Sequence, residues 1–432
     1  MKIAWVTPTD EKSAIFEYSK IVSKELSKRA DLIVFGTTES SAELSCKYYS
    51  LNDEEAIHKL KESDVVIYNM GDNYNFHSKI FETYLKIPGI IILHDLYFEN
   101  LLNGYFSKLE NGVEVKKETI KHIKKYIENK VSPSLLHNFF GDSSYATGLI
   151  QAMFEPILVN ALGVISHCQE SNEVVSKIYP FLCKAINLPY KSQPIKVNAG
   201  KETSKIELTT VGYVNKEKRH DLVIQAIAEN KELRNKIHYN IAGPYNEDSD
   251  YFKNLISIVN KFGLAATVTF HGQISKEDME KVFSKTDVFI NLRKPCLNTG
   301  SWSLVEELAS GKPVVTENFG FARSLPDDVV IKLKATSHIS ELKKLSKILD
   351  ETSSSSSIRK KYGVKSIEFV KENNSPSKYC DDLIKFAKEV ISNKPLKHQQ
   401  ELSSICATYQ PLVHTDSAAF KSFFNFSGII KK

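Results

Sequence analysis

The stretch VFINLRKPCLNTGSWSLVEELASGKPVVTENFG, residues 288–320, decides the fold class of this chain. It begins with a short apolar run and a polar loop, continues with a helical segment that carries Glu306, and ends in a Gly-Lys-Pro turn and a second apolar run. A strand, a helix and a second strand within about 30 residues form the repeating unit of a parallel α/β sheet. The stretch therefore predicts a doubly wound α/β domain.

The start of the helix in this stretch is a candidate phosphate site. The first turn of a helix leaves backbone N–H groups without partners and carries the positive end of the helix dipole. We therefore expect a phosphate group near Gly300, Ser301 and Ser303. Glu306 follows about one turn later, where its carboxylate can accept hydrogen bonds from the hydroxyls of a ribose. The alternative is an ordinary βαβ unit with a surface glutamate.

Length and composition favour a globular protein of two domains. The chain has 432 residues, which is enough for two substantial apolar cores. Its 42% hydrophobic and 25% charged residues are typical of soluble proteins, and no run of about 18 apolar residues predicts a membrane span. The N-terminal MKIAWVTPTDEKS lacks the features of a signal peptide, which predicts a cytoplasmic location.

The cysteines and the charged residues limit which metals, ligands and macromolecules this chain is expected to bind. The 6 cysteines are scattered without a C-x-x-C pair, which disfavours a metal centre or a disulfide framework. A net charge of +5 favours a nucleotide, phospholipid or lipid diphosphate, and is too low for a dedicated nucleic-acid binder. The lysine-rich segment 108–130 is either a solvated helix face or a weak contact to anionic lipid. The aromatic tail 396–432 is expected to pack on the body or to form an oligomer contact.

The first half alternates strand and helix patterns. Apolar runs at 1–7, 31–36 and 64–71 predict strands, and the run PGIIILHD at 88–95 ends on His94 and an aspartate. Ligands of open α/β sheets bind beyond the carboxyl ends of the strands, where His94 is expected to lie. A histidine at such a position either packs in the core or contacts a ligand.

The second half repeats the alternation after a polar stretch at 190–205. A strand ends at Gly212, a basic loop containing Lys218 and Arg219 follows, and a helix then begins. Cations and free amides that converge at a sheet edge make a plausible diphosphate cradle, although loop lysines are often bystanders. Two further predicted strands end at Gly243 and at Gly272, which follows His271.

Several other motifs are absent or better explained by structure. The chain has no G-x-G-x-x-G fingerprint, P-loop, nucleophile elbow or H-E-x-x-H motif. Asp248-Ser249-Asp250 spells a D-x-D, a pattern that can hold a divalent ion, but it directly precedes a helical pattern and is better suited to capping that helix. The serine-rich run ETSSSSS at 351–357 predicts a hinge or a helix cap. We therefore expect no metal site.

The segment VEELASGKPVV resembles the end of the E-x7-E signature of retaining glycosyltransferases of family 4, which have the two-domain GT-B fold. Glu306 matches the second glutamate of that signature. The first glutamate, which in the family holds hydroxyls of the donor sugar, corresponds to Asn298, or to Thr299 with a shift of one residue. The loss of this carboxylate leaves the identity of the sugar open.

Two further segments resemble motifs of the same family. VGYVNKEK is similar to the G-R-x-x-x-x-K motif that holds the nucleotide diphosphate, with Lys218 at the lysine and Tyr213 at the arginine. We expect the adjacent Arg219 to supply the missing charge. The segments at 68–77 and 88–95 resemble G-N-x-x-x-H and P-G-x-x-x-L-H-D, which implies that His94 contacts a sugar hydroxyl or the acceptor.

The resemblance implies a GT-B fold of two Rossmann-like domains facing a central cleft. It predicts an acceptor-side domain at 1–195, a nucleotide-sugar domain at 196–375, a helix crossing back at 376–395 and a C-terminal extension at 396–432. Lys218, Arg219, Glu306 and His94 are the expected catalytic residues. The expected donor-binding residues are Gly212, Gly243, His271, Gly272, Asn298, Thr299, Gly300, Ser301, Ser303 and Leu304.

The implied activity is metal-independent, retaining transfer of a hexose-type sugar from a UDP- or GDP-linked donor to a glycan, lipid-linked glycan or protein hydroxyl. The donor is a substrate, so no resident cofactor is expected. The resemblance suggests polysaccharide assembly in the cytoplasm or at the inner face of the membrane. The alternative is a non-catalytic GT-B subunit that stabilises a partner transferase or recognises a glycosylated substrate, which the missing glutamate and the tyrosine at position 213 favour.

Overall fold

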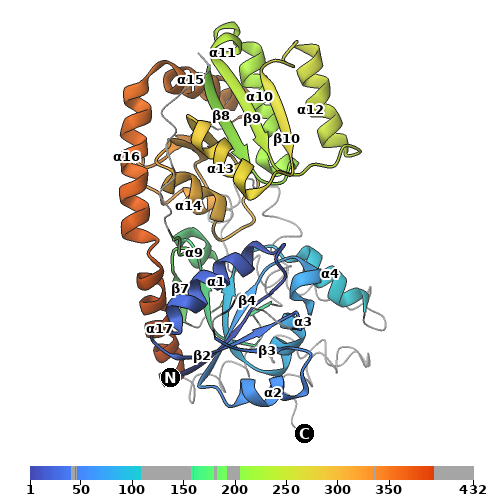
Figure 1. The fold of residues 1–432 in the computed structure, drawn as a ribbon, viewed down its shortest axis with the longest axis vertical. Helices are drawn as coiled ribbons and strands as arrows, with labels where there is room; N and C mark the ends of the chain where they lie inside the picture. Colours follow the sequence, from blue (N-terminus) through green and yellow to red (C-terminus); the bar gives the residue numbers. More distant parts are fainter. Residues whose placement is uncertain are drawn as a thin grey trace. The chain divides into compact units, whose positions relative to one another are not determined.

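The computed structural model divides the chain into two compact units, each built on a parallel sheet (Figure 1). Unit 1 contains the described residues of Met1–Pro189, Leu297–Gly300 and Pro376 onward, and unit 2 contains those of Tyr190–Cys296 and Ser301–Ser375. The chain thus passes from unit 2 to unit 1 and back at residues 297–300. The structure describes residues 1–39, 44, 46–108, 157–158, 160–179, 182–191, 205–334 and 337–393.

Unit 1 holds a seven-stranded parallel sheet with the order β3-β2-β1-β4-β5-β6-β7. Its central strands β4 and β5 are buried along their whole length, as expected for strands that are covered on both faces. The strands are β1 (Lys2–Val6), β2 (Asp31–Gly36), β3 (Lys47–Ser50), β4 (Val65–Met70), β5 (Gly89–Leu93), β6 (Ala161–Ser166) and β7 (Cys183–Ala185).

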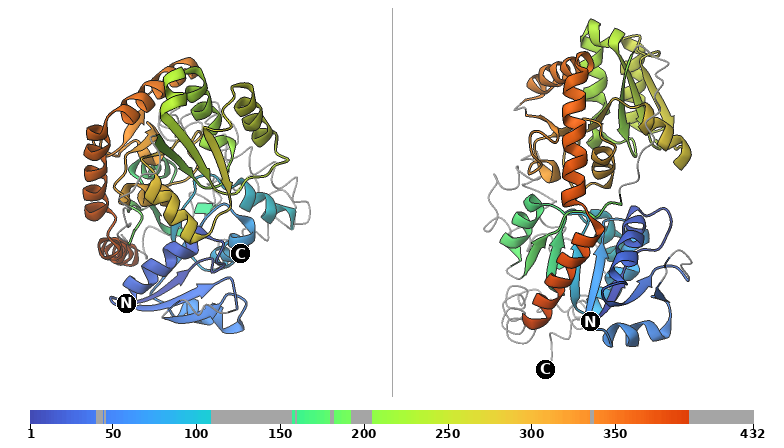
Figure 2. Two further views of the ribbon diagram at one scale, coloured as in Figure 1. Left: turned by 45° about the horizontal axis from the view of Figure 1, so that its top comes forward. Right: turned by 60° about the vertical axis from the view of Figure 1, so that its left-hand side comes forward.

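Helices cover both faces of this sheet (Figure 2). Helices α1 and α17 pack together, and α3 packs with α4. The N-cap of α3 shows why helices begin where they do, because the Asn73 side chain accepts hydrogen bonds from the backbone N–H groups of Asn75 and Phe76. The helices are α1 (Ala14–Leu26), α2 (Glu54–Lys61), α3 (Tyr74–Lys86), α4 (Glu99–Ser107), α9 (Gln169–Ile178) and α17 (Pro376–Asn393).

Unit 2 holds a six-stranded parallel sheet with the order β10-β9-β8-β11-β12-β13. The strands are β8 (Ile206–Val211), β9 (Ile237–Ala242), β10 (Val268–Gly272), β11 (Val288–Asn291), β12 (Val314–Glu317) and β13 (Ile331–Leu333). The helices are η1 (Lys216–Lys218), α10 (His220–Glu229), α11 (Lys231–Lys236), α12 (Asp250–Lys261), α13 (Lys276–Lys285), α14 (Trp302–Ala309), η2 (Gly320–Ala322), α15 (His338–Ser354) and α16 (Ser356–Asn373).

The order of strands reverses once in each sheet. In unit 1 the chain moves outward on both sides of β1, and in unit 2 it does so on both sides of β8. Such a switch point opens a crevice beyond the carboxyl ends of the central strands, where ligands of open α/β folds bind. The prediction of a doubly wound α/β fold with two Rossmann-like sheets is confirmed.

The serine-rich run and the D-x-D motif both cap helices. Ser355 ends α15 and caps α16, where its hydroxyl accepts from the Ile358 N–H at 3.3 Å. Ser249 caps α12 in the same way, with its hydroxyl accepting from the Phe252 N–H at 3.3 Å. These short polar side chains replace the backbone acceptors that the first turn of a helix lacks.

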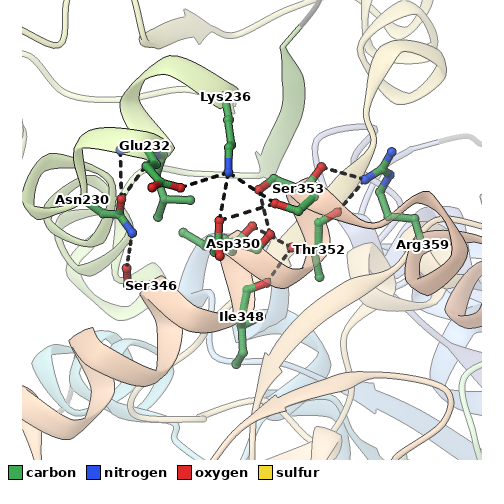
Figure 3. A network of polar contacts seen from close by, with 12 residues as sticks. Asn230, Glu232, Lys236, Ser346, Ile348, Asp350, Thr352, Ser353 and Arg359 are labelled. Carbon is green, nitrogen blue, oxygen red and sulfur yellow. Dashed lines mark hydrogen bonds and ion pairs between the residues drawn. The ribbon is translucent and has the colours of Figure 1, made fainter.

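A polar network joins α11, α15 and α16 (Figure 3). Lys236 of α11 pairs with Asp350 of α15 at 3.4 Å, and the Arg359 guanidinium of α16 donates to the backbone carbonyls of Thr352 at 2.6 Å and Ser353 at 3.1 Å. The guanidinium therefore satisfies carbonyl groups in the last turn of α15, which have no partner within the helix. This network holds the two long helices at the turn between them.

Helix α17 packs on unit 1. Its Tyr379 hydroxyl bonds the Tyr18 hydroxyl of α1, and its Asp381 pairs with Arg29 at 3.0 Å. A Cβ on Gly163 of β6 would lie 2.7 Å from a Val390 methyl group of α17, so the helix lies directly against that strand. The chain therefore ends its described part within the unit in which it began.

Some predicted features lie outside the described residues. These are most of the lysine-rich segment 108–130, the predicted domain boundary between residues 195 and 196, and the aromatic tail. Among the described helices, none is both long and apolar enough to cross a membrane.

We predict that Leu383→Ala on α17 lowers the free energy of unfolding of unit 1 by about 2–5 kcal/mol, because it leaves a cavity at a fully buried position. Lys385→Ala, at an exposed position of the same helix, is the matched control and should change stability by less than about 0.5 kcal/mol. Urea denaturation followed by circular dichroism measures both. Equal stability of the two variants would show that α17 does not brace the unit.

Candidate functional site

Three strands of unit 2 end in glycines that allow the backbone to pack closely. Gly212 follows β8, Gly243 follows β9 and Gly272 ends β10, and Gly243 and Gly272 form a bridge. A Cβ on Gly243 would lie 2.2 Å from the Gly212 carbonyl oxygen, and one on Gly212 would lie 2.9 Å from Lys218 Nζ. Close approach and positive φ angles favour glycine at positions 212 and 243, so the ends of β8 and β9 meet beside the Lys218 ammonium.

Lys218 ends the short helix η1 with its side chain turned back under the end of β8. Its Nζ donates to the Val211 carbonyl at 2.7 Å, and the residue is 8% exposed. Burial lowers the pKa of Lys218 to about 7, the positive charge of Arg293 adds to this, and Glu307 and Glu217 oppose it. An ammonium has three donors, so two remain for a ligand after the bond to Val211.

Arg219, expected to replace the motif arginine, is held by two carboxylates. It has a left-handed backbone conformation with φ of 56°. Its Nη1 donates to Glu317 at 2.7 Å and its Nη2 to Glu341 at 2.6 Å, and Lys294 pairs with Glu341 at 3.0 Å. The guanidinium thus fastens the η1 loop to β12 and α15, and its expected role on a phosphate stays a prediction.

The N-terminus of α14 presents two hydroxyls and a guanidinium. Ser301 is the N-cap, and its Oγ accepts from the Leu304 N–H at 3.2 Å. Arg293 Nη2 lies 3.4 Å from Ser301 Oγ and 3.5 Å from Ser303 Oγ. The predicted binding residues Ser301, Ser303 and Leu304 are therefore gathered at one helix start, as an anion site requires.

Two adjacent glutamates of α14 have different surroundings. Glu306 is half-buried, and its side chain makes no hydrogen bond or ion pair with any other residue that the structure describes. Burial raises its pKa, and Lys276 opposes this rise. Glu307 is fully buried, and its Oε2 accepts from Asn291 Nδ2 at 2.8 Å. Glu306 therefore has both oxygens available for ligand hydroxyls, whereas Glu307 belongs to the interior of the site.

The Glu307 carboxyl interacts with the charges of Lys218 and Arg293. Burial raises the pKa of Glu307 to about 8, while its bond to Asn291 and the charges of Lys218 and Arg293 oppose that rise. Reasoning from sequence missed both Glu307 and Arg293. Their signals were the doubled glutamate at 306–307 and an arginine two residues past an apolar strand, neither of which is specific without the structure.

The polar residues on the face of β8 to β10 form a ladder. His271 Nε2 donates to Asn240 Oδ1 at 2.8 Å, and Asn240 Nδ2 donates to Glu207 at 2.7 Å. His238 bonds the same Glu207 carboxylate at 2.8 Å. Burial lowers the pKa of His271, so the ring is neutral near pH 7. The hydrogen bond to Asn240 therefore fixes the orientation of the His271 ring, which precedes Gly272 in the chain.

The predicted residues Asn298, Thr299 and Gly300 group with unit 1 and pair with the end of β5. The Thr299 N–H donates to the His94 carbonyl at 2.9 Å, and the Asn298 amide bonds the Asp95 carboxylate. A Cβ on Gly300 would lie 2.8 Å from the Cβ of His167. The structure therefore brings these residues together with His94 inside unit 1, and places Lys218, Ser301, Ser303 and both glutamates together inside unit 2.

His94 is a neutral histidine in an aromatic cluster. Asn69 Nδ2 donates to the Val6 carbonyl at 3.0 Å, so its Oδ1 accepts from His94 Nε2 at 3.2 Å and the proton of His94 sits on Nε2. Burial lowers the pKa of His94 well below its usual value, and His167 and His77 add to this. The ring of His94 lies 5.0 Å from that of Tyr18 and 4.9 Å from that of His167. Its Nδ1 therefore carries a lone pair that can accept a hydroxyl proton.

Comparison with known proteins supports the fold. Residues 192–365 match the family model for glycosyl transferases group 1. The glycosyltransferase of Rickettsia africae superposes with a TM-score of 0.61 at 11% identity over 91% of this chain and 99% of that one. Anabaena HepE in complex with UDP gives 0.59 at 12% over 90% and 100%, and WaaG, a glycosyltransferase of lipopolysaccharide biosynthesis, gives 0.54 at 14% over 88% and 99%. No curated protein sequence matches significantly.

The fold and the site define an enzyme of the glycosyltransferase class with the GT-B fold. Residues 192–365, which match the model for glycosyl transferases group 1, include Lys218, Arg293 and both glutamates of α14. Placement in family 4 and retention of configuration stay predictions.

We predict that Arg219→Gln lowers the free energy of unfolding by about 3–5 kcal/mol, because it leaves Glu317 and Glu341 buried without their shared cation. Arg323→Gln, at an exposed position of unit 2, removes the same charge without burying a carboxylate and is the control. Chemical denaturation of both variants measures the difference. A stable Arg219→Gln protein would mean that the network does not hold the loop.

Acid should destabilise unit 1 through its buried histidines. Burial lowers the pKa of both His77 and His167 to about 4 from an ordinary 6.5. The unfolded chain therefore binds more protons between these values, so stability is present above pH 6.5 and is lost as the pH falls toward 4, by roughly 3 kcal/mol for each histidine. His77→Gln should flatten this dependence more than His58→Gln at an exposed site. A wild-type denaturation midpoint that does not change between pH 7 and 4.5 would contradict this prediction.

Proposed function

We propose that this protein transfers a sugar from a UDP- or GDP-linked donor to a hydroxyl acceptor, with retention of configuration and without a metal ion. The observation that carries the proposal is the buried Lys218 ammonium at the switch point of the unit 2 sheet, beside the glycine-bearing ends of β8 and β9. A buried cation with donors to spare calls for an anion as its partner.

The chemistry follows from where charge develops. Cleavage of a nucleoside-diphosphate sugar builds negative charge on the diphosphate, and donors fixed in advance stabilise that charge without rearranging. Lys218 supplies a point charge, and the N-terminus of α14 supplies backbone amides. These groups lie in one unit, which makes them a cradle for the leaving group that works without a metal ion.

Glu306 and His94 serve the sugars in this proposal. The carboxylate of Glu306 accepts hydrogen bonds from the ribose hydroxyls, because the other described residues leave its oxygens unoccupied. His94 Nδ1, which carries a lone pair because the proton sits on Nε2, accepts from a hydroxyl of the transferred sugar or of the acceptor. Retention follows when the acceptor attacks from the face that the diphosphate leaves, with the departing phosphate taking the acceptor proton.

The acceptor in this proposal is a glycan, a lipid-linked glycan or a protein, as in the polysaccharide-type enzymes that the sequence resembles. HepE, a similar structure, has been solved with UDP, with UDP and glucose, and with UDP-glucose. These complexes support testing UDP-linked donors first.

We predict that Lys218→Ala lowers turnover of the nucleotide sugar by at least about tenfold, because a charged hydrogen bond contributes about 1.5–3 kcal/mol. Lys216→Ala, an exposed lysine of the same turn, is the matched control and should retain activity. Nucleotide release from a panel of UDP-, GDP- and ADP-sugars, with and without simple glycoside acceptors, measures both. Equal turnover of the two variants would remove Lys218 from the site.

The same panel distinguishes an enzyme from a non-catalytic subunit. An enzyme releases nucleotide from one donor in the panel and gains thermal stability from it. A wild-type protein that shows neither release nor a thermal shift with any donor would contradict the proposal and favour a scaffold role.

A further inference from the structure

Helix α14 begins with a tryptophan one turn before Glu306. The helix turns Leu304, Glu307 and Leu308 into the interior of unit 2, and it leaves Trp302 and Glu306 half-buried. Residues four apart in a helix lie one above the other, so the Trp302 ring and the Glu306 carboxylate are neighbours, about 6 Å apart along the helix axis. The carboxylate that we assign to a ribose therefore lies next to a large aromatic ring.

Tyr190 adds a second ring to this face. Its ring meets that of Trp302 edge to face, with 5.6 Å between the ring centroids. The Tyr190 N–H donates to the Asn374 carbonyl at 2.7 Å, just past the end of α16, which holds the backbone of Tyr190 on unit 2. Burial raises the pKa of Tyr190, and the negative charge of Glu306 adds to this, so the phenol lies near that carboxylate. Tyr190, Trp302 and Glu306 therefore form one group, the Trp302 cluster.

The polar side-chain groups of the Trp302 cluster have no hydrogen bond to any residue that the structure describes. This holds for the Trp302 indole N–H, the Tyr190 hydroxyl and both carboxylate oxygens of Glu306. None of these atoms is fully buried. The cluster therefore offers a ligand one donor, one hydroxyl that can donate or accept, and two acceptor oxygens, beside two aromatic rings.

This combination suits a sugar ring with adjacent hydroxyls. The C–H groups on one face of such a ring are apolar and can pack on an aromatic ring, while its hydroxyls donate to a carboxylate and accept from N–H and O–H groups. A bare phosphate would instead be repelled by the carboxylate of Glu306. The Trp302 cluster therefore favours a sugar over an inorganic anion.

The position of the cluster indicates which sugar it binds. The backbone N–H groups of Trp302 and Ser303 begin α14, and they have no acceptor among the described residues. A phosphate held by these amides would have the Trp302 side chain beside it and Glu306 one turn further along the helix. In a nucleoside diphosphate the ribose is joined to its phosphate by a single ester link, so the ribose of the donor reaches the cluster.

We propose that Trp302 and Tyr190 complete, around Glu306, the ribose site of this enzyme. The Trp302 ring covers one face of the ribose, Glu306 accepts hydrogen bonds from its hydroxyls, and the Tyr190 hydroxyl bonds one of them. Trp302 and Tyr190 are then binding residues for the nucleoside, while Lys218 holds the diphosphate. The proposal rests on the proposed function, because it assumes that a nucleoside diphosphate binds to unit 2.

Tryptophan fluorescence tests this contact on the purified full chain. The chain has 2 tryptophans, and the other one, Trp5, is fully buried in β1. For whichever of UDP and GDP the wild type binds, we expect the nucleotide to change the emission of the wild type and not that of Trp302→Phe. Nucleotide binding detected by calorimetry without any change in wild-type emission would overturn the proposal.

Titration calorimetry measures the contribution of each ring. Trp302→Ala should weaken binding of the nucleoside diphosphate by about 5- to 50-fold, whereas Trp302→Phe keeps an aromatic face and should weaken it less than about threefold. Tyr190→Phe keeps the ring and loses the hydroxyl, so it should weaken binding by about three- to tenfold. Ile339→Ala removes an exposed apolar side chain of the same unit and should bind as the wild type does.

Inorganic pyrophosphate separates the ribose contact from damage to the diphosphate site. It has no ribose, so Trp302→Ala and Tyr190→Phe should bind it as the wild type does. Equal losses of affinity for pyrophosphate and for the nucleoside diphosphate would overturn the assignment. If Trp302→Ala does not fold, the emission of the wild type and the affinity of Tyr190→Phe decide the question.

The outcomes distinguish failure of this proposal from failure of the proposed function. If Trp302→Ala and Tyr190→Phe bind the nucleotide as tightly as the wild type while Lys218→Ala does not, the cluster is not the ribose site and the proposed function stands. A change in Trp302 emission with simple glycosides but not with nucleotides would assign the cluster to an acceptor sugar and overturn the proposal. If the wild type binds neither UDP nor GDP, both proposals are wrong.

Discussion

A buried ammonium beneath the end of a parallel strand is the interaction on which the candidate site depends. Lys218 reaches back to the Val211 carbonyl at 2.7 Å, in space that exists because Gly212 has no side chain. Burying a positive charge is unfavourable unless hydrogen bonds and negative charge compensate it. Here one carbonyl and the Glu307 carboxylate compensate in part, so the site gains free energy when a phosphate approaches from the strand ends.

The fold could be predicted because its signals are local. Continuous apolar runs such as that of β5 and glycines at strand ends such as Gly243 are visible in any short window of the sequence. The same holds for Lys218 and for the hydroxyls at the start of α14. The partners of Arg219 could not be predicted, since Glu317 and Glu341 lie 98 and 122 residues away along the chain. The sequence shows that a basic residue belongs to a loop. Only the fold shows which carboxylates lie next to it and neutralise its charge.

The loop before α14 illustrates the same limit in another way. Sequence places Asn298, Thr299 and Gly300 beside the serines that follow them, because all five residues belong to one polar loop. In the structure the chain divides between Gly300 and Ser301, and the first three residues hydrogen-bond or pack within unit 1. The side chain of Asn298 is engaged by Asp95, 203 residues away. Donor contacts expected of this loop therefore divide between groups fixed in unit 2 and groups fixed in unit 1.

The two basic residues at the end of η1 differ in their negative partners. Arg219 has two buried carboxylates, so an added phosphate would have to displace Glu317 and leave it buried without a cation, or take Glu341 from one of its two cations. Lys218 has no comparable ion pair: its Nζ donates to the Val211 carbonyl at 2.7 Å, and Glu307 acts on it through its charge. An arginine can therefore lie next to Lys218 in sequence and still be neutralised by carboxylates of the protein itself. The carboxylates around a cation show whether the protein itself neutralises its charge, and the position of the cation in a motif does not show this.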